Sequence, residues 1–146
     1  MVMVVKYITD KELLNIFTNM VRAQTAYIDR QLSFLNLSNG QGGVIMMLGR
    51  HGCLTQNELA RFRQVTPATI SIMLDRMERD GLVVRSSPEG NNRVKNVMLT
   101  EKGKEVYKQL DKFMEREPAV VFKGLTEEEK KIAATVFQKI TKNVMK

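Results

Sequence analysis

The sequence predicts a mainly α-helical chain that carries one small β-hairpin. Three observations lead to this fold class. Apolar residues recur every three or four positions over long stretches at both ends of the chain, which is typical of amphipathic helices. Two short stretches near the centre each begin with a helix-capping threonine. After Gly81 the pattern changes to two short apolar runs around a polar, turn-rich segment, which is typical of paired strands.

The N-terminal part predicts a long helix followed by a short one. The apolar positions of the long helix are Leu13, Ile16, Phe17, Met20, Val21, Tyr27, Ile28, Leu32 and Leu35. We expect Asn39, Gly40, Gly42 and Gly43 to interrupt the helical pattern. The short helix then carries the apolar run 44–48, and Gly49 and Gly52 indicate its end.

The centre predicts two short helices joined by a tight turn. Thr55 and Glu58 have the spacing of a capping box, which opens a helix to about Arg63 that buries Leu59 and Phe62. Thr66 and Pro67 are an N-cap and a first-turn proline. The helix that they open is expected to stop at Gly81 and to bury Ile70, Met73, Leu74 and Met77. This is a helix-turn-helix arrangement.

A β-hairpin follows directly. Residues 82–85 and 94–99 predict two strands, and the polar segment 86–93 predicts the tip between them. A hairpin attached to a helix-turn-helix is a wing. With a short strand around Cys53 and Leu54, the predicted fold is a winged helix-turn-helix.

Two more helices complete the chain. Thr100 is expected to cap the first, whose apolar face holds Val106, Tyr107, Leu110, Phe113 and Met114. Pro118 and Gly124 are expected to break it, and Thr126 with Glu129 forms a capping box for the second. The apolar face of the last helix, expected to mediate dimerisation, holds Ile132, Ala133, Val136, Phe137, Ile140 and Val144.

The predicted order is helix-helix-strand-helix-helix-strand-strand-helix-helix. We expect a single domain over 1–146, with a winged-helix lobe at 53–99 and a helical dimerisation lobe formed by 1–50 and 100–146. The apolar faces of the terminal helices need a partner, and a second copy of the chain is the simplest one. The alternative is that they pack only on their own domain.

Composition narrows the possible partners. The chain has 146 residues, a formal net charge of +7 and an isoelectric point near 9.7, which favours nucleic acid ahead of an acidic membrane surface. One cysteine and one histidine exclude an internal disulfide and a structural zinc site of the Cys/His kind. We expect no metal or other cofactor. No apolar run is long enough for a signal peptide or a bilayer span, so we expect a cytoplasmic protein that binds no membrane.

The helix that begins at Pro67 is the expected recognition helix. Its outward side chains are small and polar in the first half, which suits close approach to base edges in a major groove. Thr69 and Ser71 can bond to bases or phosphates, and Ala68 and Ile72 can contact thymine methyl groups. Alternatively, Ile72 packs within the fold, and Arg76 pairs with Asp75 or Asp80. Asp75 would repel phosphate and is expected to orient a neighbouring arginine.

The wing and the first motif helix supply the remaining expected contacts. Arg93 could enter the minor groove, and Arg85 and Lys95 suit phosphates, although each could be a solvated charge. The amides that follow Thr55 and Gln56 could hold a phosphate, as could Arg63. The expected DNA-binding residues are Thr55, Gln56, Arg63, Thr66, Pro67, Ala68, Thr69, Ser71, Ile72, Arg76, Arg85, Asn92, Arg93 and Lys95.

In order and spacing the chain resembles the MarR family of bacterial and archaeal regulators over nearly its whole length. Residues 54–60 are similar to the first motif helix of that family, 66–71 and 74–78 to its recognition helix, and 81–85 and 97–103 to the flanks of its wing. The wing tip departs from the family, which usually has an acidic residue and two arginines there. Asn91, Asn92 and Arg93 take these places, so the minor-groove role falls on Arg93 alone and an expected partner of that arginine is lost.

The resemblance implies a DNA-binding transcription regulator, most often a repressor. It implies a homodimer held by the first and last two helices, on a pseudo-palindromic operator with recognition helices about 34 Å apart. Many members release DNA when a small aromatic molecule binds between the dimer and DNA-binding regions. By helical register the candidates for such a pocket are Tyr27, Phe34, Met46, Met47, Tyr107 and Met114, each of which could instead be a core residue.

Three other functions compete with this interpretation. An enzyme would have to use His51 and Cys53, which have no third orienting group nearby, so we expect no catalysis. A redox sensor would have to use Cys53, which is predicted to lie in a short strand, where a buried and inert thiol is common. A winged helix that contacts a protein is disfavoured by the basic charge and by the outward face of residues 67–80.

Overall fold

The computed structural model describes residues 6–145, and its element order agrees with the predicted one. The elements are α1 (Asp10–Ser33), α2 (Asn39–His51), β1 (Cys53–Thr55), α3 (Gln56–Arg63), α4 (Pro67–Arg79), β2 (Val83–Ser86), β3 (Asn96–Leu99), α5 (Glu101–Val121) and α6 (Glu127–Val144). Two compact units are present, Met1–Lys112 and Phe113–Lys146. Among the described residues no helix has both the length and the apolar character of a membrane span.

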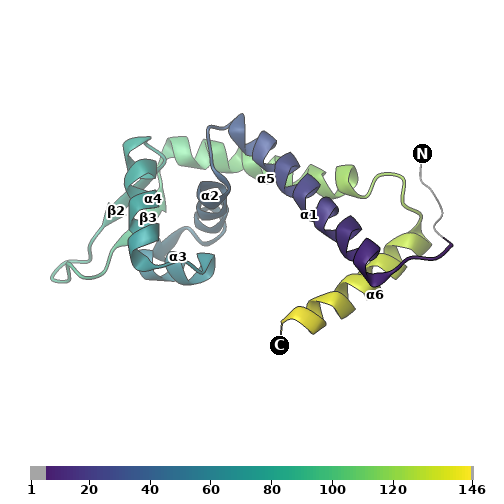
Figure 1. The fold of residues 1–146 in the computed structure, drawn as a ribbon. Coiled ribbons are helices and arrows are strands. Elements are labelled where there is room, and N and C mark those ends of the chain that lie inside the picture. Colours follow the sequence, from purple (N-terminus) through teal and green to yellow (C-terminus); the bar gives the residue numbers. More distant parts are fainter. Residues whose placement is uncertain (1–5, 146) are drawn as a thin grey trace. The chain divides into compact units, whose positions relative to one another are not determined.

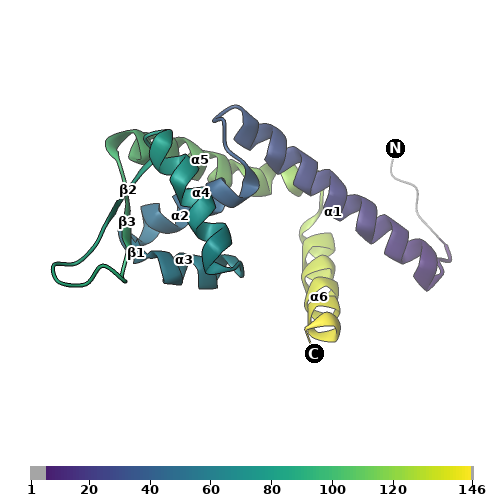
Figure 2. The same ribbon diagram turned by 60° about the vertical axis from the view of Figure 1, so that its left-hand side comes forward.

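A three-stranded antiparallel sheet lies in the first unit, with the strand order β1-β3-β2. The helices α2, α3 and α4 pack together beside this sheet, and the loop between β2 and β3 extends away from them (Figures 1 and 2). The core that they share holds Ile45, Leu59, Ile70, Leu74 and Val97, none of which is exposed to solvent. The helix α2 therefore shares its core with the helix-turn-helix and the sheet.

Two predicted helix boundaries are wrong. The glycines after Asn39 do not interrupt the helical pattern but form the first turns of α2, which is capped by Ser38 and Gln41. The glycines permit close packing there, since a Cβ at Gly42 would lie 2.9 Å from Leu32 of α1. Pro118 does not break the chain but lies within α5, which ends at Val121. A proline removes one N–H donor from a helix. Here the helix loses that one hydrogen bond but continues for three more residues, to Val121.

Three burial predictions are wrong. Phe62 is 59% exposed and stacks on His51 at a centroid distance of 6.3 Å, while Ala60 is the second buried residue of α3. Met73 is half-buried. Cys53 is exposed, because Leu54 occupies the inner side of the short strand and neighbouring strand residues alternate between faces.

Apolar helix faces remain uncovered in both units. In α1 the side chains of Leu13, Ile16 and Met20 are 46–54% exposed, and only Leu32 is buried. In α6 no residue is buried, and Ile132 is 57% exposed. Amphipathic helices in water bury their apolar faces, and neither of these two faces is covered by its own unit.

The start of α5 passes unusually close to the start of β2, and this contact generates the first prediction. A Cβ at Gly103 would lie 2.1 Å from the carbonyl oxygen of Leu82, a backbone atom that cannot move aside. We expect Gly103→Ala to lower the free energy of unfolding by about 1–3 kcal/mol, the usual cost of overpacking. Urea denaturation at one fixed protein concentration measures the effect.

Gly40→Ala is the matched control for Gly103→Ala. The nearest atom to a Cβ at Gly40 would be the terminal methyl of Met73 at 2.7 Å, the far end of a flexible side chain that can rotate away. Alanine is also favoured over glycine within a helix by about 1 kcal/mol. We therefore expect Gly40→Ala to be neutral or stabilising, and equal losses in the two variants would contradict the role assigned to Gly103.

The capping box of α3 generates a pH-dependent prediction. The backbone N–H of Thr55 donates to Glu58 at 2.8 Å, and this bond lowers the pKa of Glu58 below its ordinary value. A carboxyl with a lowered folded-state pKa stabilises the fold above its unfolded pKa of about 4.3 and loses that effect as pH falls through the folded pKa. Glu58→Gln keeps an acceptor oxygen but cannot ionise.

We therefore expect the difference in unfolding free energy between the parent protein and Glu58→Gln to be largest near neutral pH. It should begin to shrink as the pH falls below about 4.3, the pKa of an unfolded glutamate, and vanish once the pH is below the lowered folded-state pKa, where both side chains are uncharged. Urea denaturation of both proteins over this pH range measures it. A difference that does not change with pH would contradict the role of the ionised carboxylate.

Candidate nucleic-acid interface

The expected recognition helix α4 presents a small and exposed N-terminal half. Thr66 is its N-cap and accepts a hydrogen bond of 3.1 Å from the backbone N–H of Thr69. The two threonine hydroxyls lie 2.8 Å apart and are both at the surface. Ile72 is 57% exposed, so it does not pack within its own chain. Bulky apolar side chains that stay in water on an otherwise buried motif are typical of contact surfaces.

The turn before α4 depends on one residue in an unusual backbone conformation. Gln64 caps α3 in the left-handed region, with a φ of 54°, and its N–H bonds to carbonyls of the last helical turn. Glycine or asparagine is the usual choice at such a position. Because Gln64 is neither residue, the turn has no sequence signal of its own, and the helix-turn-helix is predicted from its two threonine caps alone.

The start of α3 and the base of the wing line one polar hollow of about 280 Å³. The two segments are joined by a hydrogen bond of 2.8 Å from the backbone N–H of Gln56 to the carbonyl of Lys95. Three cations meet at this hollow, from the wing and from the last turn of α3. Its lining residues are Thr55, Gln56, Asn57, Glu58, Arg61, Arg93, Val94 and Lys95.

Four of these lining residues, Thr55, Gln56, Arg93 and Lys95, were expected at a DNA interface, whereas Arg61 was missed. The helical period contains the missing signal. Leu59 and Ala60 are the buried residues of α3, so Arg61 on the next position turns outward, as Asn57 does one turn earlier. A basic residue on the outward face of this short helix is therefore a sequence signal for a phosphate contact.

At the wing tip a side-chain hydrogen bond holds the backbone of Arg93. The side-chain oxygen of Asn91 accepts a hydrogen bond of 3.0 Å from the backbone N–H of Arg93. Gly90, with a φ of 79°, makes the preceding turn. Asn91 thus supplies a partner at the place where the sequence comparison suggested that one was lost, although it holds the backbone and not the guanidinium.

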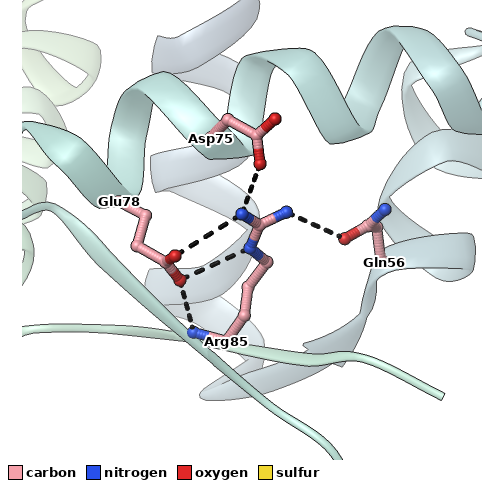
Figure 3. Close-up of polar contacts among 4 residues, drawn as sticks. All are labelled: Gln56, Asp75, Glu78 and Arg85. Atoms are coloured by element: carbon pink, nitrogen blue, oxygen red, sulfur yellow. Dashed lines mark hydrogen bonds and ion pairs between the residues drawn. The ribbon is translucent and has the colours of Figure 1, made fainter. Parts of the chain in front are cut away.

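Arg85 lies at the centre of a polar network that joins β2 to α3 and α4 (Figure 3). Its guanidinium donates to Asp75, to Glu78 at 3.4 Å and to Gln56 at 3.5 Å, and its backbone N–H donates to Glu78 at 3.1 Å. Burial disfavours the charge, but the hydrogen bonds to Asp75 and Glu78 outweigh it and raise the pKa of Arg85. Asp75 therefore orients a neighbouring arginine, and that arginine comes from the wing.

Arg63 also turns toward its own chain. A Cβ at Gly43 of α2 would lie 2.4 Å from a terminal guanidinium nitrogen of Arg63. Its Nε atom is buried and has no hydrogen-bond partner within residues 6–145. Of the expected phosphate contacts, Arg63 and Arg85 are thus packed against protein, whereas Arg76, Arg93 and Lys95 are exposed.

The six candidates for a ligand pocket lie in different environments. Met46 is buried, Tyr27 and Met47 are half-buried, and Tyr107 packs on Gly49 of α2. Phe34 is 80% exposed at the end of α1, and Met114 belongs to the second compact unit. The six dimerisation candidates all lie on α6, where Ala133 and Ile140 are half-buried and the other four are exposed.

The sequence is similar to known proteins of one family. Residues 37–95 match the model of the MarR family. An uncharacterized HTH-type transcriptional regulator of Bacillus cereus is 31% identical over 113 residues, which cover 77% of this chain and 75% of that protein. The HTH-type transcriptional repressor MdtR of Bacillus subtilis is 30% identical over 97 residues, covering 66% of this chain and 63% of MdtR.

The fold agrees with these sequence matches. The solved structure of a MarR protein from Peptoclostridium difficile superimposes with a TM-score of 0.74 at 24% identity, over 99% of this chain and 94% of that one. The family model covers α2 to the base of the wing, which is the part that carries the helix-turn-helix. The chain therefore belongs to the MarR family of DNA-binding transcriptional regulators.

Proposed function

We propose that the protein is a repressor that binds a pseudo-palindromic operator as a homodimer. The observation that carries the proposal is the pairing of two surfaces in one compact unit. One is the small, exposed N-terminal half of α4, and the other is the basic hollow between α3 and the wing. The first suits base edges in a major groove, and the second suits the phosphates beside it.

The proposed roles follow from exposure and chemistry. Thr66, Thr69 and Ser71 offer hydroxyls to bases or phosphates, and Pro67, Ala68 and Ile72 form the apolar edge that faces thymine methyl groups. Asn92 and Arg93 of the wing reach the minor groove. Thr55, Gln56 and Lys95, together with Arg76 of α4, are assigned to phosphates.

Repression, dimerisation and release by an effector have separate support. MdtR, a relative with 30% identity, is named a repressor. The uncovered apolar faces of α1 and α6 favour a second copy of the chain as the partner. Release by a small aromatic molecule rests on family membership. The burial of Met46 and the packing of Tyr107 make these two the better-placed pocket candidates.

A two-fold dimer presents two copies of α4, and this symmetry is the reason to expect a palindromic site. Half-sites one helical turn apart would place the two helices in successive major grooves. A monomer would contact only one half-site and lose much of the affinity. The proposed DNA-binding function therefore depends on the dimer for affinity and on α4 for the choice of sequence.

DNA binding is tested with a duplex that the parent protein selects from a random-sequence library. Arg93→Ala removes a charge, so we expect weaker binding and a salt slope reduced by about 0.9 for each phosphate charge no longer neutralised. Fluorescence anisotropy at several salt concentrations measures both quantities. Lys108→Ala, which removes an exposed cation of α5, is the control and should change neither.

The contact of the uncharged Thr69 hydroxyl with DNA is tested in the same assay. We expect Thr69→Ala to weaken binding about fivefold, the effect of one lost hydrogen bond, and to leave the salt slope unchanged. Thr69→Ser keeps the hydroxyl and should bind nearly as well as the parent. Binding that is insensitive to salt and to all these substitutions would favour a winged helix that contacts another protein.

The dimer is tested by adding charge to α6. Val136 is 42% exposed on the apolar face, and Gln138 lies on the opposite side of the helix. Val136→Glu would bury an unpaired carboxylate in each half of the dimer, so we expect the dissociation constant to rise by at least about tenfold. Analytical ultracentrifugation measures it. Gln138→Glu adds the same charge and should not change it; an unaffected Val136→Glu dimer would place the interface elsewhere.

A further inference from the structure

The recognition helix carries negative charge on the side that is expected to approach DNA. Asp75 follows Ala68 by seven positions and Ile72 by three, so these side chains lie along one outward stripe of α4. Glu78 adds a second carboxylate in the next turn. Unpaired carboxylates near a phosphate backbone oppose binding, because like charges brought together across an interface cost several kcal/mol.

Arg85 meets both carboxylates from the inner side. Its side chain is 18% exposed, compared with 54% for Asp75 and 43% for Glu78. The guanidinium donates one N–H from Nε to Glu78, one to Gln56, and one each to Asp75 and Glu78 from its remaining nitrogen. Four of the five donors of an arginine are thereby used within the chain, which leaves little capacity for a phosphate.

The cations of α4 itself do not take this role. Within residues 6–145 neither Arg76 nor Arg79 forms an ion pair, and both are exposed. The two arginines of α4 only balance its two carboxylates, so the helix by itself has no net side-chain charge. When Arg85 is added to these four side chains, their summed charge becomes +1. The positive charges of the exposed arginines of α4 are then no longer cancelled.

We propose that Arg85 is a positioning residue for DNA binding. By neutralising Asp75 and Glu78 from inside the protein, it lets α4 approach the phosphate backbone without itself contacting DNA. The inference rests on the proposed DNA-binding function of α4. It assigns to Arg85 a different role from the phosphate contact that its place in the sequence suggested.

The test separates charge from contact with three variants. Arg85→Ala leaves both carboxylates uncompensated, and we expect at least about tenfold weaker binding to the selected duplex. Asp75→Asn with Glu78→Gln breaks the same network but keeps the cation, so this double variant should bind at least as tightly as the parent. The triple variant that combines all three substitutions should return to within about twofold of the parent, with its salt slope restored.

Each alternative gives a different pattern in these titrations. If Arg85 contacts a phosphate, the triple variant stays as weak as Arg85→Ala. If the network is only a structural tie, the double variant is as weak as Arg85→Ala. Either result overturns the inference while leaving DNA binding intact, as does an Arg85→Ala protein that binds like the parent. A parent protein that selects no duplex overturns the proposed function, and the inference with it.

Folding of each variant is checked by circular dichroism at the assay temperature. Arg85→Lys provides a second route to the decision if Arg85→Ala does not fold. A lysine keeps the positive charge but cannot form the same forked hydrogen bonds. Neutralisation predicts that Arg85→Lys binds within a few-fold of the parent, and a loss as large as about tenfold would contradict it.

Discussion

The packing of α2, α3 and α4 against a very small sheet is the constraint on which the rest of the molecule depends. Helices of 8 and 13 residues and strands of 3 or 4 are too short to persist alone in water. Their stability comes from shared burial, with Leu59, Ile70, Leu74 and Val97 fully removed from solvent. The outward side chains of α4 have a defined direction only because the inner ones are held in this core.

Polar contacts set the helix ends and the position of the wing around this core. Side-chain caps begin α3 and α4 at defined residues, and the bond from Gln56 to Lys95 fixes the base of the wing beside α3. The Arg85 network adds a link from β2 to both motif helices. Because this link is built from opposite charges at a half-buried position, it connects the geometry of the wing to the electrostatics of the recognition helix.

The terminal helices differ from the core in how much of their apolar surface is buried. They are long and amphipathic, and much of their apolar surface stays exposed in a single chain. The proposed DNA-binding surface and the proposed dimerisation surface lie on different elements, and the short helices of the first pack fully within one chain. The family model likewise covers residues 37–95, which hold the motif, whereas the structural superposition with a MarR protein extends over the terminal helices as well.

The order of the elements, the caps of α3, α4 and α6, and the family could be predicted from the sequence alone, as could three of the four core residues expected in α4. Caps, helical period and strand period are local signals, which is why the boxes at Thr55 and Thr126 and the cap at Thr66 were predicted correctly. Tertiary structure decided the burial of Phe62 and Cys53, the helical glycines of α2, the meeting of Arg61 with the wing, and the partners of Arg85. Each of these depends on which segment lies opposite. Asp75 and Arg85 are ten positions apart and on different elements, so only the folded chain brings their charges together.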